Sequence, residues 1–302
     1  MPTAAIRLER YAWWSVAAAL ATMGLKTFAW WLTGSVGLLS DALESLVNLV
    51  AALIALWMLR LAALPPDDAH PYGLSKAEYF SAGIEGGLII LAAAGIVATA
   101  FPRLIAPQPI EMPGWGMAFS LVATVINLAA ALALIRAGKA YRSITLEADG
   151  RHLMTDVWTS VGVVVGVGLV LATGWLVLDP LVALAVAVHI IWAGIGLMRR
   201  SVSGLLDAAI PQAELDEIVR IFAEYSRRYG VSFHAFRTRQ AAARRFISFH
   251  LLVPDQWPVA QAHRLSDEIE ERIRELVEGA AVFTHIEPIS DPASYNDEGL
   301  DR

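Results

Sequence analysis

The first two thirds of the chain alternate long apolar stretches with short polar ones. Six of these stretches have about the twenty residues that an α-helix needs to cross a bilayer. They cover residues 11–32, 36–61, 79–102, 115–137, 146–173 and 176–198. From about residue 205 the apolar stretches end and shorter periodic patterns take over. The sequence therefore predicts a membrane bundle of six transmembrane helices, followed by a smaller domain outside the membrane.

The last third of the chain shows two kinds of periodicity. Two segments repeat apolar residues at the spacing of an amphipathic helix, and three have the alternating pattern of strands. In chain order these segments are residues 213–228, 233–239, 245–253, 259–277 and 281–286. The order α-β-β-α-β predicts a small two-layer, ferredoxin-like α+β domain.

These patterns divide the chain into three parts. We predict a six-helix transmembrane domain over residues 1–204 and a C-terminal α+β domain over residues 205–290. Residues 291–302 are polar, and we predict that they form a disordered tail.

The distribution of basic residues predicts the orientation in the membrane. With six spans, Arg103 lies in a loop on one side, and the other basic residues at the ends of the spans and in the loops between them lie on the opposite side. That second group comprises Arg7, Arg10, Arg60, Lys76, Arg136, Lys139, Arg142, Arg199 and Arg200. Because basic loops stay in the cytoplasm, we predict that both termini are cytoplasmic.

Composition narrows the classes of function. The chain has 302 residues, of which 56% are hydrophobic and 17% charged, and its mean hydropathy is +0.53, as expected of a membrane protein. It has no cysteine, which excludes disulfides, zinc–thiolate sites and cysteine nucleophiles. With a net charge of −6, the chain lacks the excess of basic residues that is typical of nucleic-acid-binding proteins.

Two of the predicted spans carry matching polar triplets. Each triplet has steps of three and then four residues, which places its members on one face of a helix. The triplets are Asp41, Glu44 and Asn48 in the second span, and Asp149, His152 and Asp156 in the fifth. Ionisable side chains inside a membrane are costly and usually mark an ion pathway.

Four of these side chains suit a tetrahedral metal site between two helices, namely Glu44, Asn48, His152 and Asp156. Asp41 and Asp149 lie one turn nearer the helix starts, and two roles stay open for them: entry-path carboxylates or partners of the ligands. Glu85 in the third span is either a proton relay or a carboxylate that sits near the cytoplasmic end. The pattern indicates a metal-ion transporter.

Several segments resemble the cation diffusion facilitator family. Residues 34–48 look like its second span, and residues 148–156 look like its fifth. The loop from Asp67 to Gly73, followed by Lys76-Ala77-Glu78, is similar to the family's loop between spans two and three. Leu205-Leu206-Asp207 and the α+β domain also match, so the resemblance extends from about residue 8 to 290.

The resemblance implies a secondary transporter rather than an enzyme. The family is expected to form homodimers in the lipid bilayer and to export divalent metal ions in exchange for protons by alternating access. Zn²⁺, Fe²⁺, Mn²⁺ or Co²⁺ would be substrate and regulator, with no organic cofactor and no nucleic acid. We expect the inner membrane of a bacterium.

When the positions of the family's transport site are matched to this sequence, the resemblance implies a site made of Glu44, Asn48, His152 and Asp156. Family members that move zinc usually have Asp or His at position 44 and Asp at position 48, and this chain departs at both. Asn48 removes a titratable negative charge, which Asp41 would restore. Glu and Asn are oxygen ligands that favour Mn²⁺ or Fe²⁺, whereas His152 suits Zn²⁺, Fe²⁺ or Co²⁺.

The resemblance also implies three further features. A second metal site in the loop would use Asp67 and His70, but Leu74 stands where the family has its last His, and a solvated loop is the alternative. Lys76 and Asp207 match a pair near the family's dimer interface. A regulatory metal site in the cytoplasmic domain would use His234, His250, His263, His285 and Glu287, the alternative being surface or core histidines.

Three rival functions remain. An intramembrane metallohydrolase would need a His-Glu-x-x-His pair, and the sequence has none. The second rival is a metal sensor or scaffold that has lost transport, in which Asn48 would be the substitution responsible for the loss. A carrier of a different cation would be distinguished by flux of monovalent ions.

Overall fold

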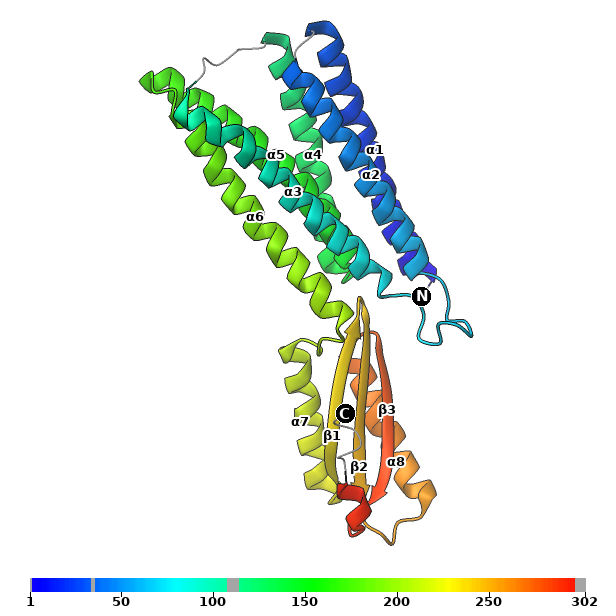
Figure 1. The fold of residues 1–302 in the computed structure, drawn as a ribbon. Coiled ribbons are helices and arrows are strands. Elements are labelled where there is room, and N and C mark those ends of the chain that lie inside the picture. The colour runs from blue at the N-terminus through cyan, green and yellow to red at the C-terminus, as the bar shows by residue number, and fades with distance from the viewer. Residues whose placement is uncertain (1, 34–35, 108–113, 297–302) are drawn as a thin grey trace. The chain divides into compact units, whose positions relative to one another are not determined.

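The structure is a computed structural model that describes residues 2–33, 36–107 and 114–296 (Figure 1). Within the helices, the side chains of residues 2–7, 36–41 and 114–117 lie outside the described set, and so does that of Thr33. The chain divides into two compact units, Met1–Val202 and Ser203–Arg302. We describe each unit by itself.

The first unit consists of long helices. They are α1 (Pro2–Thr33), α2 (Val36–Ala62), α3 (Ala77–Ile105), α4 (Gly114–Ala140), α5 (Ile144–Thr173) and α6 (Leu178–Leu205). Among the described residues, α2 to α6 are long and apolar enough to cross a membrane. The remaining helix, α1, is 32 residues long and includes Lys26 and several tryptophans. The predicted fold class of this part is confirmed.

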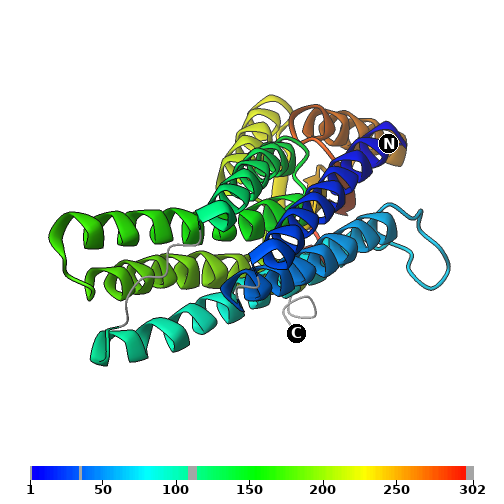
Figure 2. The same cartoon turned by 90° about the horizontal axis from the view of Figure 1, so that it is seen from above.

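Helices α1, α2, α4 and α5 share one core. Helix α1 lies beside α2 and α4, and α5 lies beside α4 and α3 (Figures 1 and 2). The shared core is made of alanines, leucines and a valine, including Ala12, Val16, Ala52, Leu134 and Leu153. Small side chains allow the close helix contact that stabilises bundles in lipid.

Local sequence signals set both ends of α5. The Ser143 side chain accepts a hydrogen bond from the backbone N–H of Leu146 at the start, as a helix N-cap does. At the other end, Gly174 takes a left-handed conformation with φ of 76°, which a residue without a side chain adopts at little cost. The Asp149, His152 and Asp156 stripe thus lies on a helix with a defined start.

Helices α4 and α5 contact each other through glycines. A Cβ atom on Gly138 would lie 2.6 Å from the backbone nitrogen of Glu147. One on Gly150 would lie 2.9 Å from the carbonyl oxygen of Ala131. Because backbone atoms cannot move aside as a flexible side chain can, these two helices fit together only with glycine at both positions.

We expect Gly138→Ala to destabilise the protein by about 1–3 kcal/mol, because the added methyl group overpacks the α4–α5 contact. The measurement is the melting temperature of the full-length protein in detergent. Gly168→Ala in α5 is the matched control, since nothing lies within 4 Å of a Cβ there. Equal melting temperatures for the two variants would show that the contact has room for a methyl group.

The second unit is an α+β domain with a three-stranded sheet. Its elements are α7 (Gln212–Tyr229), β1 (Ser232–Ala241), β2 (Arg244–Val253), α8 (Val259–Leu276), β3 (Ala280–Pro288) and a 3₁₀ turn, η1 (Pro292–Tyr295). The strand order is β1-β2-β3, with β1 antiparallel and β3 parallel to β2. The predicted order α-β-β-α-β is confirmed.

Both helices pack on the sheet through a single apolar core. Ile218 and Phe222 of α7, Ile247 and Phe249 of β2, and Ile269 of α8 are all buried in it. Helix α8 makes the crossover that a parallel β2–β3 pair requires. The strand side chains that alternate with these core residues point to the other face of the sheet.

The C-terminal segment differs from the predicted disorder. The side chain of Asp291 accepts a hydrogen bond from the N–H of Ala293 (2.9 Å) and caps η1. The hydroxyls of Ser294 and Tyr295 donate to the carbonyls of Pro288 (2.8 Å) and Ile289 (2.9 Å). Side-chain hydrogen bonds therefore order residues 291–296, which composition alone does not reveal; residues 297–302 lie outside the described part.

Candidate functional site

A buried hydrogen-bonded cluster joins α2 to α5. The Asn48 Nδ2 atom donates to Asp156 Oδ2 (2.5 Å), and the His152 Nε2 atom lies 2.8 Å from Asn48 Oδ1. All three side chains are buried. The structure thus brings together three of the four residues predicted for the transport site.

This pattern fixes which ring nitrogen of His152 carries hydrogen. Asn48 must direct its NH₂ group at the carboxylate of Asp156, because its carbonyl oxygen would be repelled there. Its oxygen then faces His152, and a carbonyl oxygen only accepts, so Nε2 carries the hydrogen. The lone pair of neutral His152 is therefore on Nδ1.

Asn127 of α4 completes the cluster, and the sequence analysis missed it. Its Nδ2 atom donates to the same oxygen of Asp156 at 3.0 Å, and its side chain is buried. The available signal was one carboxamide in an otherwise apolar span, which usually marks a helix–helix contact. We call Asn48, Asn127, His152 and Asp156 the membrane cluster.

Two carboxylates lie beside the membrane cluster. The Glu85 Oε2 atom of α3 is 3.6 Å from Nδ1 of His152. Asp149 lies one turn before His152 on α5, and both carboxylates are almost fully buried. Glu85 therefore faces the interior of the bundle, against His152.

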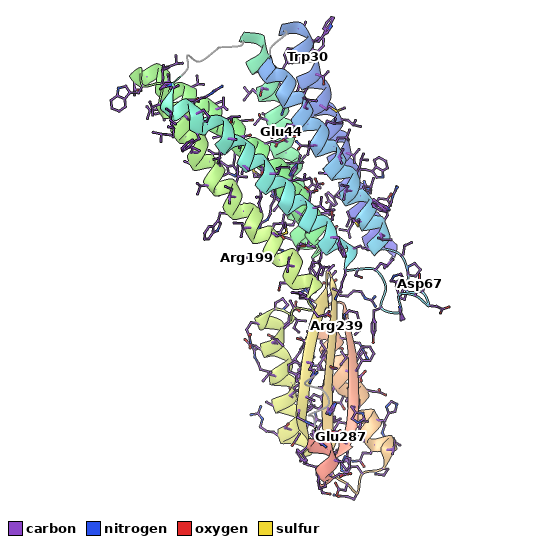
Figure 3. The ribbon with its side chains drawn as sticks, viewed as in Figure 1. Trp30, Glu44, Asp67, Arg199, Arg239 and Glu287 are labelled. Carbon is purple, nitrogen blue, oxygen red and sulfur yellow. The ribbon has the colours of Figure 1, made fainter. Side chains whose placement is uncertain are left out.

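The other members of the predicted stripe are less closely placed. Glu44 is half-buried on α2, one turn before Asn48 (Figure 3). Asp41 lies on the same helix, but its side chain is outside the described set. Among the described residues of the first unit, no three His, Asp or Glu ligand atoms lie within 4.8 Å of one another. Hydrogen bonds, rather than converging ligand atoms, define the membrane cluster in this conformation.

A compact set of ligand atoms does exist in the second unit. Glu287 Oε2 is 2.8 Å from Nε2 of His234 and 3.2 Å from Nδ1 of His250. The ligand atoms of these residues, which we call the C-terminal trio, lie within 4.8 Å of one another. Two imidazoles and a carboxylate are suitable ligands for Zn²⁺ and similar ions.

The register of the sheet brings the trio together. His234 pairs with His250 across β1 and β2, and His250 pairs with His285 across β2 and β3. Neighbouring ring centroids are 4.9 and 5.0 Å apart. Glu287, labelled in Figure 3, lies on β3 two residues after His285, and residues two apart in a strand share a face.

The remaining predicted histidines lie outside the trio. His285 is exposed, with its Nε2 atom 3.5 Å from Oε1 of Glu287. His263 is exposed on α8, with its Nε2 atom 3.4 Å from Oδ2 of Asp267. Both side chains are accessible to a further ligand or to another subunit.

The loop between α2 and α3 contains Asp67 and His70 close together. The backbone N–H of His70 donates to Asp67 Oδ1 (2.6 Å), which holds the pKa of Asp67 below its usual value. The imidazole Nδ1 is 3.3 Å from the same oxygen, and both side chains are exposed.

Lys76 belongs to the first unit and Asp207 to the second, so the predicted pairing of these two residues stays a prediction.

Comparison with known proteins gives matches over nearly the whole chain. Residues 12–206 match the cation efflux transmembrane domain, and residues 210–289 match the cytoplasmic domain of cation efflux proteins. An uncharacterised transporter of Synechocystis is 52% identical over 290 residues, covering 96% of this chain and 93% of the relative. The cation-efflux pump FieF of Salmonella arizonae is 33% identical over 276 residues, covering 91% of each chain.

A solved structure matches the second unit alone. The metal-bound C-terminal domain of the CzcD transporter from Thermotoga maritima is 27% identical to this chain. The match covers 28% of this chain and 99% of that domain, with a TM-score of 0.25 over the chain.

Proposed function

Because the chain belongs to the cation efflux family, also called the cation diffusion facilitator family, we propose that it exports a divalent metal ion from the cytoplasm in exchange for protons. The observation that carries the proposal is the buried cluster of Asn48, His152 and Asp156 between α2 and α5. Placing an imidazole, a carboxylate and a carboxamide inside a bilayer costs free energy, and such groups usually mark the path of an ion.

The proposed transport site comprises Glu44, Asn48, His152 and Asp156. A metal ion would replace the hydrogen bonds within the cluster, and Glu44 would approach from one turn away on α2. Rocking of the helices would then expose the ion to the opposite side of the membrane. Since protons compete with the metal for Glu44, His152 and Asp156, acid on the outside would favour release.

The choice among Zn²⁺, Fe²⁺, Mn²⁺ and Co²⁺ depends on the ligands. Asn48 and Glu44 offer oxygen, which favours Mn²⁺ and Fe²⁺ over Zn²⁺. His152 supplies the one nitrogen of this set, which all four ions accept. We therefore propose Mn²⁺ or Fe²⁺ as the preferred cargo.

The test is uptake into proteoliposomes by the purified protein, with a pH-sensitive dye inside the vesicles. We would offer each of the four ions separately. Metal movement coupled to opposite proton movement is the expected result. Metal binding with no flux for any ion would refute export and favour a sensor or scaffold in which Asn48 prevents transport.

The C-terminal unit, over residues 205–290, is proposed to bind metal as a regulator and to contribute to a homodimer. The C-terminal trio supports this proposal because its ligand atoms already converge. His285 and His263, both exposed, would add ligands from the same subunit or from its partner. Lys76 and Asp207 are proposed to pair near the dimer interface.

We expect Glu287→Gln to weaken metal binding by the C-terminal unit roughly tenfold or more, because it replaces the carboxylate shared by His234 and His250 with a neutral amide. Calorimetric titration of the full-length protein with Zn²⁺ would measure the change. Glu275→Gln on the exposed face of α8 is the control and should leave binding unchanged. An equal loss in both variants would contradict a role for the trio.

A further inference from the structure

The hydrogen bonds of the membrane cluster leave one nitrogen of His152 facing away from Asn48. Nε2 is occupied by its contact with Asn48 Oδ1, whereas Nδ1 has no hydrogen-bond partner among the described residues. The nearby Glu85 Oε2 atom is 3.6 Å away, beyond hydrogen-bond distance. The available lone pair of His152 thus faces α3 rather than the predicted transport site.

The carboxylates on this side of His152 are also unsatisfied. Neither Glu85 oxygen has a hydrogen-bond partner within the described part of the chain, and the same holds for Asp149 Oδ2. Ser15 of α1 is close to Asp149, yet that oxygen stays unpaired. Glu85 and Asp149 are each 1% exposed, and His152 is 4% exposed. Buried ionisable groups without partners are rare in proteins, and an ion or water bound beside them is one explanation.

The distance between Glu85 and His152, together with the nearby charge of Asp149, fits a cation held between the first two side chains. An ion held about 2.1 Å from each of two ligand atoms in tetrahedral geometry separates them by roughly 3.4 Å. The observed separation of Nδ1 and Oε2 is 3.6 Å. The carboxylates of Glu85 and Asp149 are also close enough to interact electrostatically. A divalent ion would compensate both charges, at a depth where unpaired charge is expensive.

Glu85 lies nearer than Asp156 to the joined starts of α3 and α5. The starts of α3 and α5 are joined, because the hydroxyl of Thr145 donates to the carbonyl of Glu78 at 3.2 Å. Counting from those starts at 1.5 Å per residue, Glu85 is about 12 Å along α3 and Asp156 about 18 Å along α5. An ion entering from this end meets Glu85 before it reaches Asp156.

We propose that Glu85 and Nδ1 of His152 form a second binding position for the transported divalent cation, located between the helix starts and the membrane cluster, with Asp149 supplying a further negative charge beside it. Glu85 supplies there the carboxylate that position 48 does not provide. Because a neutral imidazole has one lone pair, His152 serves one position at a time, and the ion passes from Nδ1 to Nε2 when the ring changes tautomer. This inference rests on the proposed export function.

The test compares full-length variants in which His250→Ala and Glu287→Gln silence the C-terminal trio. Mn²⁺ binding is measured by equilibrium dialysis, and Mn²⁺ uptake is measured in proteoliposomes. We expect Glu85→Gln to lower affinity and uptake rate about tenfold or more, and Glu85→Asp to retain part of both. Ser81→Ala, one turn earlier on α3 and likewise buried without a partner, is expected to change neither.

A change of selectivity separates a ligand from a residue that merely supports the fold. Glu85→His replaces an oxygen ligand with nitrogen and should shift the ratio of Zn²⁺ to Mn²⁺ binding toward Zn²⁺. If the Gln, Asp and His variants all lose binding equally and melt at lower temperature, Glu85 is structural and the proposal is wrong.

The outcomes also distinguish this inference from the proposed function. Normal binding and uptake by Glu85→Gln, together with loss of uptake in Glu44→Ala, would leave export intact and eliminate the second position. If the membrane unit of the unaltered protein neither binds nor transports any of the four ions, the proposed export function and the second cation position are both wrong.

Discussion

Replacing His152 with alanine is expected to reduce metal uptake by two orders of magnitude or more, on the scale of about a hundredfold that the loss of even a supporting residue can cause. His152 is the one imidazole that contacts Asn48, and its second nitrogen faces Glu85. Both proposed cation positions therefore depend on this side chain. Uptake of Mn²⁺, Fe²⁺, Co²⁺ and Zn²⁺ into proteoliposomes measures the effect.

His189→Ala provides the matched control for that experiment. His189 is also on a membrane helix, but it is exposed on α6, where its ring packs against Trp158 at a centroid distance of 5.3 Å. We expect its removal to leave uptake close to the unaltered level. Substantial uptake by His152→Ala, in protein that still elutes as one folded species, would exclude the membrane cluster as the transport site.

Converting Asn48 to aspartate is expected to tighten divalent cation binding on the order of a hundredfold. At an effective dielectric constant of 20, a new carboxylate about 4 Å from the ion would contribute about 4 kcal/mol for each unit of positive charge, or about 8 kcal/mol for a divalent cation. Repulsion from Asp156, whose Oδ2 atom lies 2.5 Å from Asn48 Nδ2, offsets part of this gain. A net effect of about 2.7 kcal/mol corresponds to the hundredfold change.

The same substitution should lower stability when no metal is present, because it replaces a hydrogen bond to Asp156 with two carboxylates in contact. Melting temperatures with and without Mn²⁺ would therefore diverge more in Asn48→Asp than in the unaltered protein. Asn127→Asp is the comparison, since Asn127 donates to the same oxygen from α4 but lies outside the proposed ligand set. Equal responses of the two variants would contradict a ligand role for position 48.

The sequence predicted the features that depend on periodicity. Hydropathy located the membrane helices, and the 3-4 spacing correctly placed Asn48, His152 and Asp156 on facing stripes. The order of elements in the C-terminal domain followed from the same reasoning. The alternation of β3 likewise put His285 and Glu287 on one face.

Features that depend on the register between elements could not be predicted. The convergence of His234 and His250 on Glu287 requires the strand pairing of β1, β2 and β3, which a single sequence does not specify. Asn127 is the one carboxamide and Glu85 the one carboxylate of its predicted span, so no repeat in the sequence linked them to Asp156 and His152. The ordered turn at Pro292–Tyr295 depends on hydrogen bonds to carbonyls of residues 288 and 289.

The glycine contacts between α4 and α5 restrict how the transporter can move. Because Gly138 and Gly150 hold the two backbones against each other, we expect these helices to move together and Asn127 to move with Asp156. Both hydrogen bonds of Asn48, in contrast, cross from this body to α2. If the bundle opens between α2 and α5 during transport, these two hydrogen bonds have to break. We expect a cation that binds the same side chains to replace both bonds, so that metal binding is coupled to the opening.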